Sequence, residues 1–125
     1  MWTKLVLIAV AGTVGTLARY WVSGLTYQLM GSRFAYGTLA VNVIGCFLFG
    51  IVWSLAEERM AIPALARVAI LVGFMGAFTT FSTFAFETMN YVRDSQFMLA
   101  FLNLGANCVL GFGAIVSGVW LARAL

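Results

Sequence analysis

The sequence predicts an all-α membrane protein with four transmembrane helices, the third of them broken, in a single domain over residues 1–125. Hydrophobic residues make up 63% of the chain and charged residues only 9%, and the mean hydropathy of +1.02 is far above that of an ordinary soluble domain. Four apolar stretches are long enough to cross a bilayer, which takes about 20 residues of helix. Little chain remains between them, so we expect no soluble domain.

The first two predicted helices cover about residues 2–30 and 36–55. Residues 4–10 resemble the core of a signal peptide, but the apolar stretch continues beyond Arg19 and no small-residue cleavage site precedes a polar mature domain. We therefore expect the first helix to be retained. A Gly-Ser-Arg turn at residues 31–33 separates it from the second helix.

The last two predicted helices cover about residues 66–91 and 97–125. A polar loop at residues 56–63 precedes the third helix, and Pro63 lies where it would start a helix rather than interrupt one. Any break inside the third helix must therefore come from its glycines and hydroxyl residues.

Residues 73–84, Gly-Phe-Met-Gly-Ala-Phe-Thr-Thr-Phe-Ser-Thr-Phe, are unusual for the interior of a membrane helix. Two glycines loosen the backbone, four hydroxyl residues supply donors and acceptors, and phenylalanines recur every three or four residues. At membrane depth, irregular backbone is stable only beside protein or water. This segment therefore predicts both the helix break and an ion site.

Polar and aromatic residues within the spans each allow more than one interpretation. Arg19 is a snorkelling anchor, or else an anion attractor or a carbonyl-bonded structural group. Asn42 is interhelical glue, or its NH2 group donates to a crossing anion. Phe81 and Phe84, one turn apart, either pack or line a path with their positive ring edges, which favour a small anion.

Three further residues stay open. Asn103 and Asn107 share one face of the fourth helix and serve either packing or the path. Glu87 is a proton-coupling site, a vestibule residue, or a helix-end group near Arg93.

The charges argue against nucleic acid and for two orientations in the membrane. The net charge is +3, but the seven basic residues are scattered singly, so nucleic-acid binding is not expected. The two cysteines lack a C-x-x-C spacing and the chain has no histidine, which argues against a zinc site. Lysine and arginine are nearly balanced between the two ends of the helices, which indicates an antiparallel, dual-topology homodimer. One end carries Lys4, Arg59, Arg67 and Arg123, and the other carries Arg33 and Arg93.

Three features together resemble the Fluc/CrcB family of bacterial fluoride channels. They are residues 73–84, Gly15 four residues before Arg19, and Asn42 followed by Gly45. The resemblance spans all four helices, and Phe-Ser-Thr-Phe at 81–84 is its most specific part. It implies an antiparallel homodimer in the bacterial inner membrane, with two pores that export cytoplasmic fluoride passively, and no enzymatic activity.

The resemblance also implies roles for individual residues. Phe81 and Phe84 would form the fluoride track, with Asn42 as a donor beside it. A structural sodium ion would lie at the dimer centre, held by the backbone carbonyls of Gly76 and Thr79. Further polar contacts in the pathway would come from Ser82, Thr83 and Asn107, and the vestibule residues would be Arg19 and Glu87.

Two other functions remain open on the sequence. A small proton-coupled multidrug exporter is also a short four-helix dimer, but it needs a carboxylate inside the first helix, where this chain has neither Asp nor Glu. A non-transporting membrane scaffold would use the same Phe, Asn and Gly residues for packing alone. No glycine-rich ATP-binding loop with lysine is present.

Overall fold

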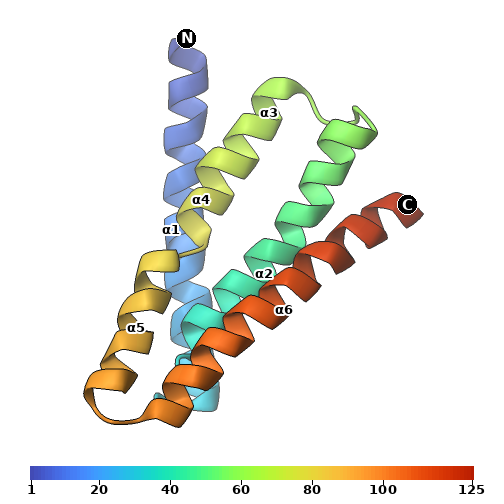
Figure 1. Ribbon diagram of the computed structural model, residues 1–125. Helices are drawn as coiled ribbons and strands as arrows, with labels where there is room; N and C mark the ends of the chain where they lie inside the picture. The colour runs from blue at the N-terminus through green and yellow to red at the C-terminus, as the bar shows by residue number, and fades with distance from the viewer.

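A computed structural model describes all residues 1–125, and its regular structure is entirely helical (Figure 1). It confirms four helical stretches long and apolar enough to span a membrane. The first is α1 (Trp2–Met30), and the second is α2 (Tyr36–Trp53) with a π-helical turn at Ser54–Glu58. The third consists of α3 (Ala64–Val68), a π-helical stretch (Ala69–Met75), α4 (Gly76–Phe78) and α5 (Phe81–Arg93), and the fourth is α6 (Phe97–Ala124).

The ends of the spans differ from the predicted ones by a few residues. The third span begins at Ala64 rather than 66, because Pro63 is its N-cap. It also continues to Arg93 rather than 91. The second span continues to Glu58, where Ser54 Oγ donates to Glu58 Oε2 over 2.7 Å and so supports the extra turn.

The predicted break in the third span is confirmed, but its glycines do not form it. Gly76 has helical dihedral angles, with φ −61° and ψ −33°. The extended residues are Thr79, with φ −86° and ψ 160°, and Thr80, with φ −150° and ψ 116°. Thr80 then caps α5, because its Oγ1 accepts the Thr83 N–H over 3.2 Å. Hydroxyl side chains can replace the backbone partners that a break removes.

Gly73 and several glycines of the other helices instead allow close contact between helices. A Cβ on Gly15 of α1 would overlap the backbone of Phe74, and one on Gly73 would press against Ile8 and Ala11. The same holds between α2 and α6, which pack most extensively of all the elements. There, Cβ atoms on Gly50 and Gly118 would overlap the carbonyls of Ile115 and Phe47, respectively. Small residues at such contacts let membrane helices approach closely.

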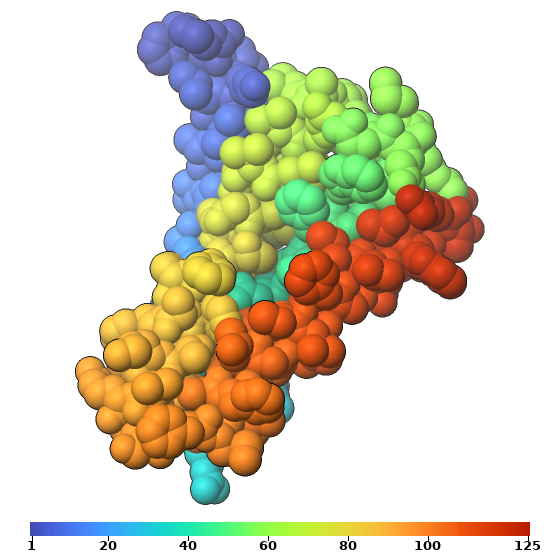
Figure 2. All heavy atoms as spheres, in the orientation of Figure 1, coloured from blue at the N-terminus to red at the C-terminus, as the bar shows by residue number.

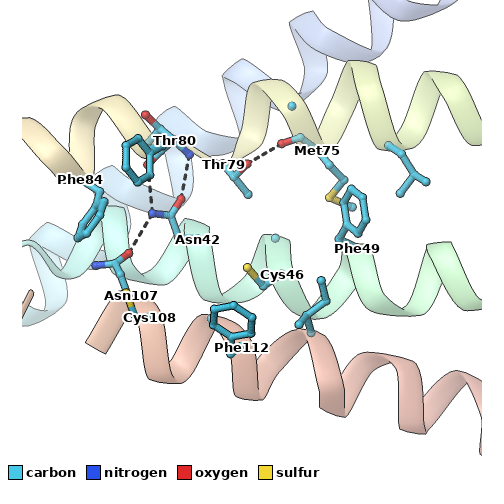
Figure 3. A pocket seen from close by; sticks show the side chains of 16 residues that line it. Asn42, Cys46, Phe49, Met75, Thr79, Thr80, Phe84, Asn107, Cys108 and Phe112 are labelled. Atoms are coloured by element: carbon cyan, nitrogen blue, oxygen red, sulfur yellow. Dashed lines mark hydrogen bonds between the residues drawn. The ribbon is translucent and has the colours of Figure 1, made fainter. Parts of the chain in front are cut away.

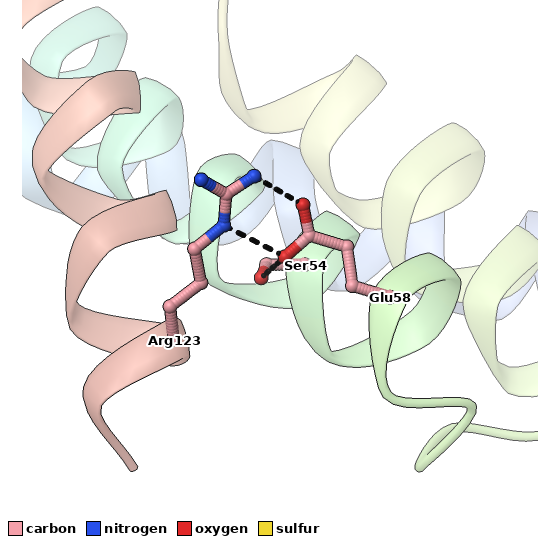
Figure 4. Close-up of polar contacts among 3 residues, drawn as sticks. All are labelled: Ser54, Glu58 and Arg123. Carbon is pink, nitrogen blue, oxygen red and sulfur yellow. Dashed lines mark hydrogen bonds and ion pairs between the residues drawn. The ribbon is translucent and has the colours of Figure 1, made fainter.

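A polar cluster joins the second span to the end of α6 (Figure 4). Arg123 Nε donates to Glu58 Oε2 over 2.9 Å, and Arg59 Nη2 donates to the Arg123 carbonyl over 2.7 Å. Glu57 forms a further ion pair with Arg67. These groups lie at the water-exposed ends of the spans, where ion pairs contribute little free energy, so we assign them to orientation of the helix ends.

The single chain leaves much of its apolar surface uncovered. Only 19 of 125 residues are buried, too few for a self-contained core, so lipid or protein must cover the remaining apolar surface. Both termini lie at the end of the bundle away from the turn between α5 and α6 (Figure 1). The space-filling view shows a hollow between the third span and α6 (Figure 2).

Candidate functional site

A cavity of about 530 Å³ lies between α2, the third span and α6 (Figure 3). It brings together six residues that the sequence selected on three different helices. They are Asn42, Gly76, Thr79, Phe81, Phe84 and Asn107. None of the residues that line it is charged. The cavity is therefore a neutral site of amides, hydroxyls and aromatic rings.

Asn42 bonds to the backbone at the break. Its Oδ1 accepts the Thr80 N–H over 2.8 Å, and its Nδ2 donates to the Thr80 carbonyl over 3.1 Å. The side chain thus bonds both the N–H and the carbonyl of Thr80, a residue with extended backbone, and so satisfies polar groups that an apolar environment cannot. These two bonds tie α2 to the third span at the edge of the cavity, which is the structural role that the sequence allowed for Asn42.

From Asn42 a chain of side-chain hydrogen bonds continues into α6 and returns to α5. Asn42 Nδ2 donates to Asn107 Oδ1 over 3.0 Å, and Asn107 Nδ2 donates to Asn103 Oδ1 over 3.1 Å and to its carbonyl over 3.0 Å. Asn103, which is fully buried, donates to Thr88 Oγ1 over 2.9 Å. Thr88 in turn donates to the Phe84 carbonyl over 2.8 Å. Packing and cavity roles therefore meet in Asn107.

The two phenylalanines form an edge-to-face pair. Their centroids lie 5.5 Å apart and their planes meet at 64°, so the edge of one ring is directed at the other ring. Phe84 is 7% exposed, whereas Phe81 is 79% exposed. The pair thus has one buried member and one that nothing in this chain covers.

Ser82 and Thr83 lie outside the cavity. Thr80 Oγ1 donates to Thr83 Oγ1 over 2.9 Å and lies 3.4 Å from Ser82 Oγ. Both hydroxyls gather at the start of α5, where they help to hold the capped end.

Arg19 and Glu87 also lie outside the cavity, on opposite sides of the break in sequence. Arg19 Nη1 makes a long contact of 3.5 Å with the Thr79 carbonyl, in keeping with the carbonyl-bonded alternative. Glu87 Oε1 accepts from Thr38 over 2.8 Å and from Tyr27 over 3.2 Å.

The helix-end interpretation of Glu87 is wrong. Arg93 pairs with Asp94 instead, over 3.6 Å. The Oε2 atom of Glu87 is buried without a hydrogen-bond partner. The carboxyl group is therefore held between α1, α2 and α5 rather than at the end of its own helix.

The break leaves carbonyl oxygens that could hold a hard cation. Thr79 N–H donates to the Met75 carbonyl over 3.1 Å, and Thr80 N–H is taken by Asn42. Neither reaches the Gly76 carbonyl, which Thr80 would hold in an uninterrupted helix. The only side chain that contacts the Thr79 carbonyl is Arg19, at the long distance of 3.5 Å. The oxygens of Gly76 and Thr79 therefore fit an oxygen-coordinated cation.

Sequence reasoning did not single out Thr80, Tyr27 or Thr38. Thr80 carries a readable signal, because a threonine directly before an amphipathic stretch is a common N-cap. Tyr27 and Thr38 carry no such sequence signal, since their partner Glu87 is about 50 to 60 residues away in the chain.

The chain is similar along nearly its whole length to known proteins. The family described as CrcB-like protein, Camphor Resistance (CrcB), matches residues 6–119. A protein of Solidesulfovibrio magneticus named fluoride-specific ion channel FluC is 51% identical over 123 residues, 98% of each chain. Proteins of the same name are 50% identical in Nitrosococcus oceani, over 98% of each chain, and 42% in Geobacter sulfurreducens, over 98% of this chain and 99% of the relative.

Proposed function

We propose that this chain, which belongs to the CrcB-like protein family, is a fluoride-specific ion channel of the bacterial inner membrane. It is a multi-pass membrane protein and not an enzyme. The observation that carries the function is the similarity to fluoride-specific channels at 42 to 51% identity over almost the full length of both chains. Fluoride leaves the cytoplasm through this channel by passive flow.

The neutral cavity suits such an ion. Fluoride is small and strongly hydrated, so a pore must replace its water with donors of comparable strength. The Asn42 amide supplies hydrogen-bond donors, and the ring edges of Phe81 and Phe84 are weakly positive. None of these groups carries a fixed charge. Because no charged side chain lines the cavity, an ion that enters is also free to leave.

The residues outside the cavity take supporting places in this proposal. Arg19 attracts anions toward the track from beside the break, and Glu87 lies near a pore mouth with Tyr27. Ser82 and Thr83 offer hydroxyls at the start of α5, next to Phe81.

We also propose that the working channel is an antiparallel, dual-topology homodimer with two pores. In support, the cavity is open on one side, and two of its aromatic residues, Phe81 and Phe112, are 79% and 73% exposed. A second copy turned upside down would cover them with an equally apolar surface. The near balance of basic residues between the two ends allows both orientations.

Topology reporters test this arrangement. One reporter is a fluorescent protein that folds only in the cytoplasm, and the other is a phosphatase that is active only in the periplasm. Each is fused to the C-terminus of this chain, and we expect both fusions to give signal. Adding two arginines after Arg123 should bias insertion and remove one of the signals. Signal from a single side in the unmodified chain contradicts dual topology.

The third proposal is a structural sodium ion on the dimer axis, held by the Gly76 and Thr79 carbonyls of both copies. Two breaks that meet there would form an oxygen cage of the kind that hard cations prefer. When bound, the ion supplies positive potential near the anion path. The support is the pair of break carbonyls without a backbone donor from Thr79 or Thr80.

Removal of sodium tests that site. Because a ligand that binds only the folded dimer stabilises it, we expect a lower thermal midpoint when sodium is replaced by N-methylglucamine. Restoring sodium at constant ionic strength should restore the midpoint. Equal midpoints in the two cations would remove the sodium proposal and leave the channel function untouched.

Fluoride efflux from liposomes tests the function itself. Vesicles with purified protein are loaded with fluoride or, in a matched set, with chloride, and efflux starts when a potassium ionophore is added. We expect rapid fluoride release and no chloride release. A scaffold releases neither ion, and a proton-coupled exporter needs a proton gradient. Passive fluoride release without a proton gradient therefore separates the three functions.

A further inference from the structure

Both amide hydrogens of Asn42 are donated to groups of the chain itself. One is donated to the Thr80 carbonyl and the other to Asn107 Oδ1 (Figure 3). A neutral amide nitrogen carries only these two donors. If Asn42 is to donate to fluoride, as the proposed function requires, one of its two present acceptors must give way.

The backbone at the break determines which of these two acceptors can be displaced. Thr80 N–H can only donate, so the Asn42 oxygen must face it and the Asn42 nitrogen must lie beside the Thr80 carbonyl. This pair of bonds closes the break in the helix. The bond to Asn107 closes nothing in the backbone, and it is therefore the one that an anion can replace at lower cost.

The orientation of Asn107 is determined in the same way. Its nitrogen faces two acceptors on Asn103, the side-chain oxygen and the carbonyl, and its oxygen faces the Asn42 nitrogen. Turning the amide over would set donor against donor at Asn42 and acceptor against acceptor at Asn103. The Asn107 oxygen is thus held toward Asn42 from behind.

We propose that the side-chain oxygen of Asn107 occupies the place of the permeating anion at Asn42, and that fluoride enters the track by displacing it. This proposal rests on the proposed channel function and adds a role for Asn107 in setting how readily an anion occupies Asn42. Asn107 acts as an acceptor that competes with the ion. It is not a donor to the ion.

Such a competitor sets a minimum hydrogen-bond strength that any anion must exceed to occupy Asn42. An entering ion must form a better hydrogen bond to the Asn42 N–H than the amide oxygen that it displaces. Charge-assisted bonds to a small anion are short and strong, whereas a larger halide spreads its charge and accepts more weakly. The bond that fluoride forms to the Asn42 N–H therefore offsets the loss of the Asn42–Asn107 bond, whereas the weaker bond to chloride does not.

The test compares two leucine substitutions on the same face of α6. The chain has four asparagines, at 42, 90, 103 and 107, so selective ¹⁵N-asparagine labelling of the full-length dimer in micelles gives a short set of side-chain amide signals. Fluoride is titrated and the Asn42 signal is followed. In Asn107→Leu we expect half-saturation at a fluoride concentration about two- to tenfold lower, the equivalent of one freed hydrogen bond.

Asn103→Leu is the matched control. It also removes a buried amide from α6, but Asn107 keeps its bond to the carbonyl of residue 103 and its oxygen stays on Asn42. We expect its half-saturation to stay within about twofold of the unmodified chain. Chloride should move the Asn42 signal in Asn107→Leu alone. If either leucine variant fails to assemble, Asn107→Ala and Asn103→Ala replace the pair.

Three results overturn the proposal. Equal or weaker fluoride binding in Asn107→Leu means that Asn107 does not compete with the ion. Equal tightening in both variants means that loosening of α6 is the cause. If the unmodified chain shows neither a fluoride-dependent Asn42 signal nor fluoride efflux, the channel function fails as well, and this result is distinct from the other two.

Discussion

Asn42→Asp is expected to lower fluoride efflux about 100-fold or more while the protein still folds and keeps its size-exclusion profile. The aspartate oxygen can still accept the Thr80 N–H, so the start of α5 keeps one of its bonds. The new carboxylate can donate neither to the Thr80 carbonyl nor to Asn107 Oδ1. It also places a negative charge in a cavity that has none, where it repels an anion in a low-dielectric environment.

Asn90→Asp is the matched control for this substitution. Asn90 lies three residues before the end of α5, and its carbonyl accepts the Asp94 N–H, a backbone bond that the change leaves intact. It does not line the cavity. We expect its efflux to stay within about twofold of the unmodified chain, since surface substitutions usually have small effects. Normal efflux from Asn42→Asp liposomes would mean that the ion does not pass this amide.

Gly118→Val is expected to have the largest effect on stability, a loss of about 3 kcal/mol or more. A Cβ at this position would overlap the Phe47 carbonyl and crowd the Ile51 nitrogen. Both are backbone atoms of α2, which cannot move aside as a flexible side chain can. Since α2 and α6 form the most extensive contact in the chain, their separation would also open the cavity between them.

The measurement is the thermal midpoint of the purified protein, followed by the loss of its size-exclusion peak after heating. Gly24→Ala is the control, because a Cβ on Gly24 of α1 meets nothing within 4 Å. Alanine is also the better helix former, so the control should match or exceed the unmodified chain. A Gly118→Val dimer with an unchanged midpoint would show that the two helices do not need the close approach.

The residues that the sequence identified best are those whose physical demand is local. Pro63 can only begin a helix, and it does. The four hydroxyls at 79–83 indicated a break, and the backbone leaves the helix at Thr79 and Thr80. The sequence reasoning also gave the glycines of this segment a part in the break, whereas Gly76 has helical dihedral angles. Gly73 lies where α1 approaches, and this contact with Ile8 and Ala11 is not visible among its sequence neighbours.

The partners of the polar groups could not be read in this way. Asn42 was expected either to hold helices together or to donate to an ion, and its bond to a peptide unit 38 residues away could not be inferred from its neighbours. Glu87 was placed near Arg93 as one alternative, because sequence distance is the only distance that a linear chain shows. In the folded chain its carboxyl group lies with Tyr27 and Thr38 instead.

By itself the sequence determined the membrane class, the number of spans and the break in the third one. A span must be a long apolar helix, and irregular backbone at membrane depth needs polar groups to satisfy it. The tertiary structure decided how the polar groups are used. A side-chain amide has two donors and one oxygen, and only the packing of α2 and α6 against the break determines which groups take them. For that reason the acceptor held against Asn42 appears only in the folded chain.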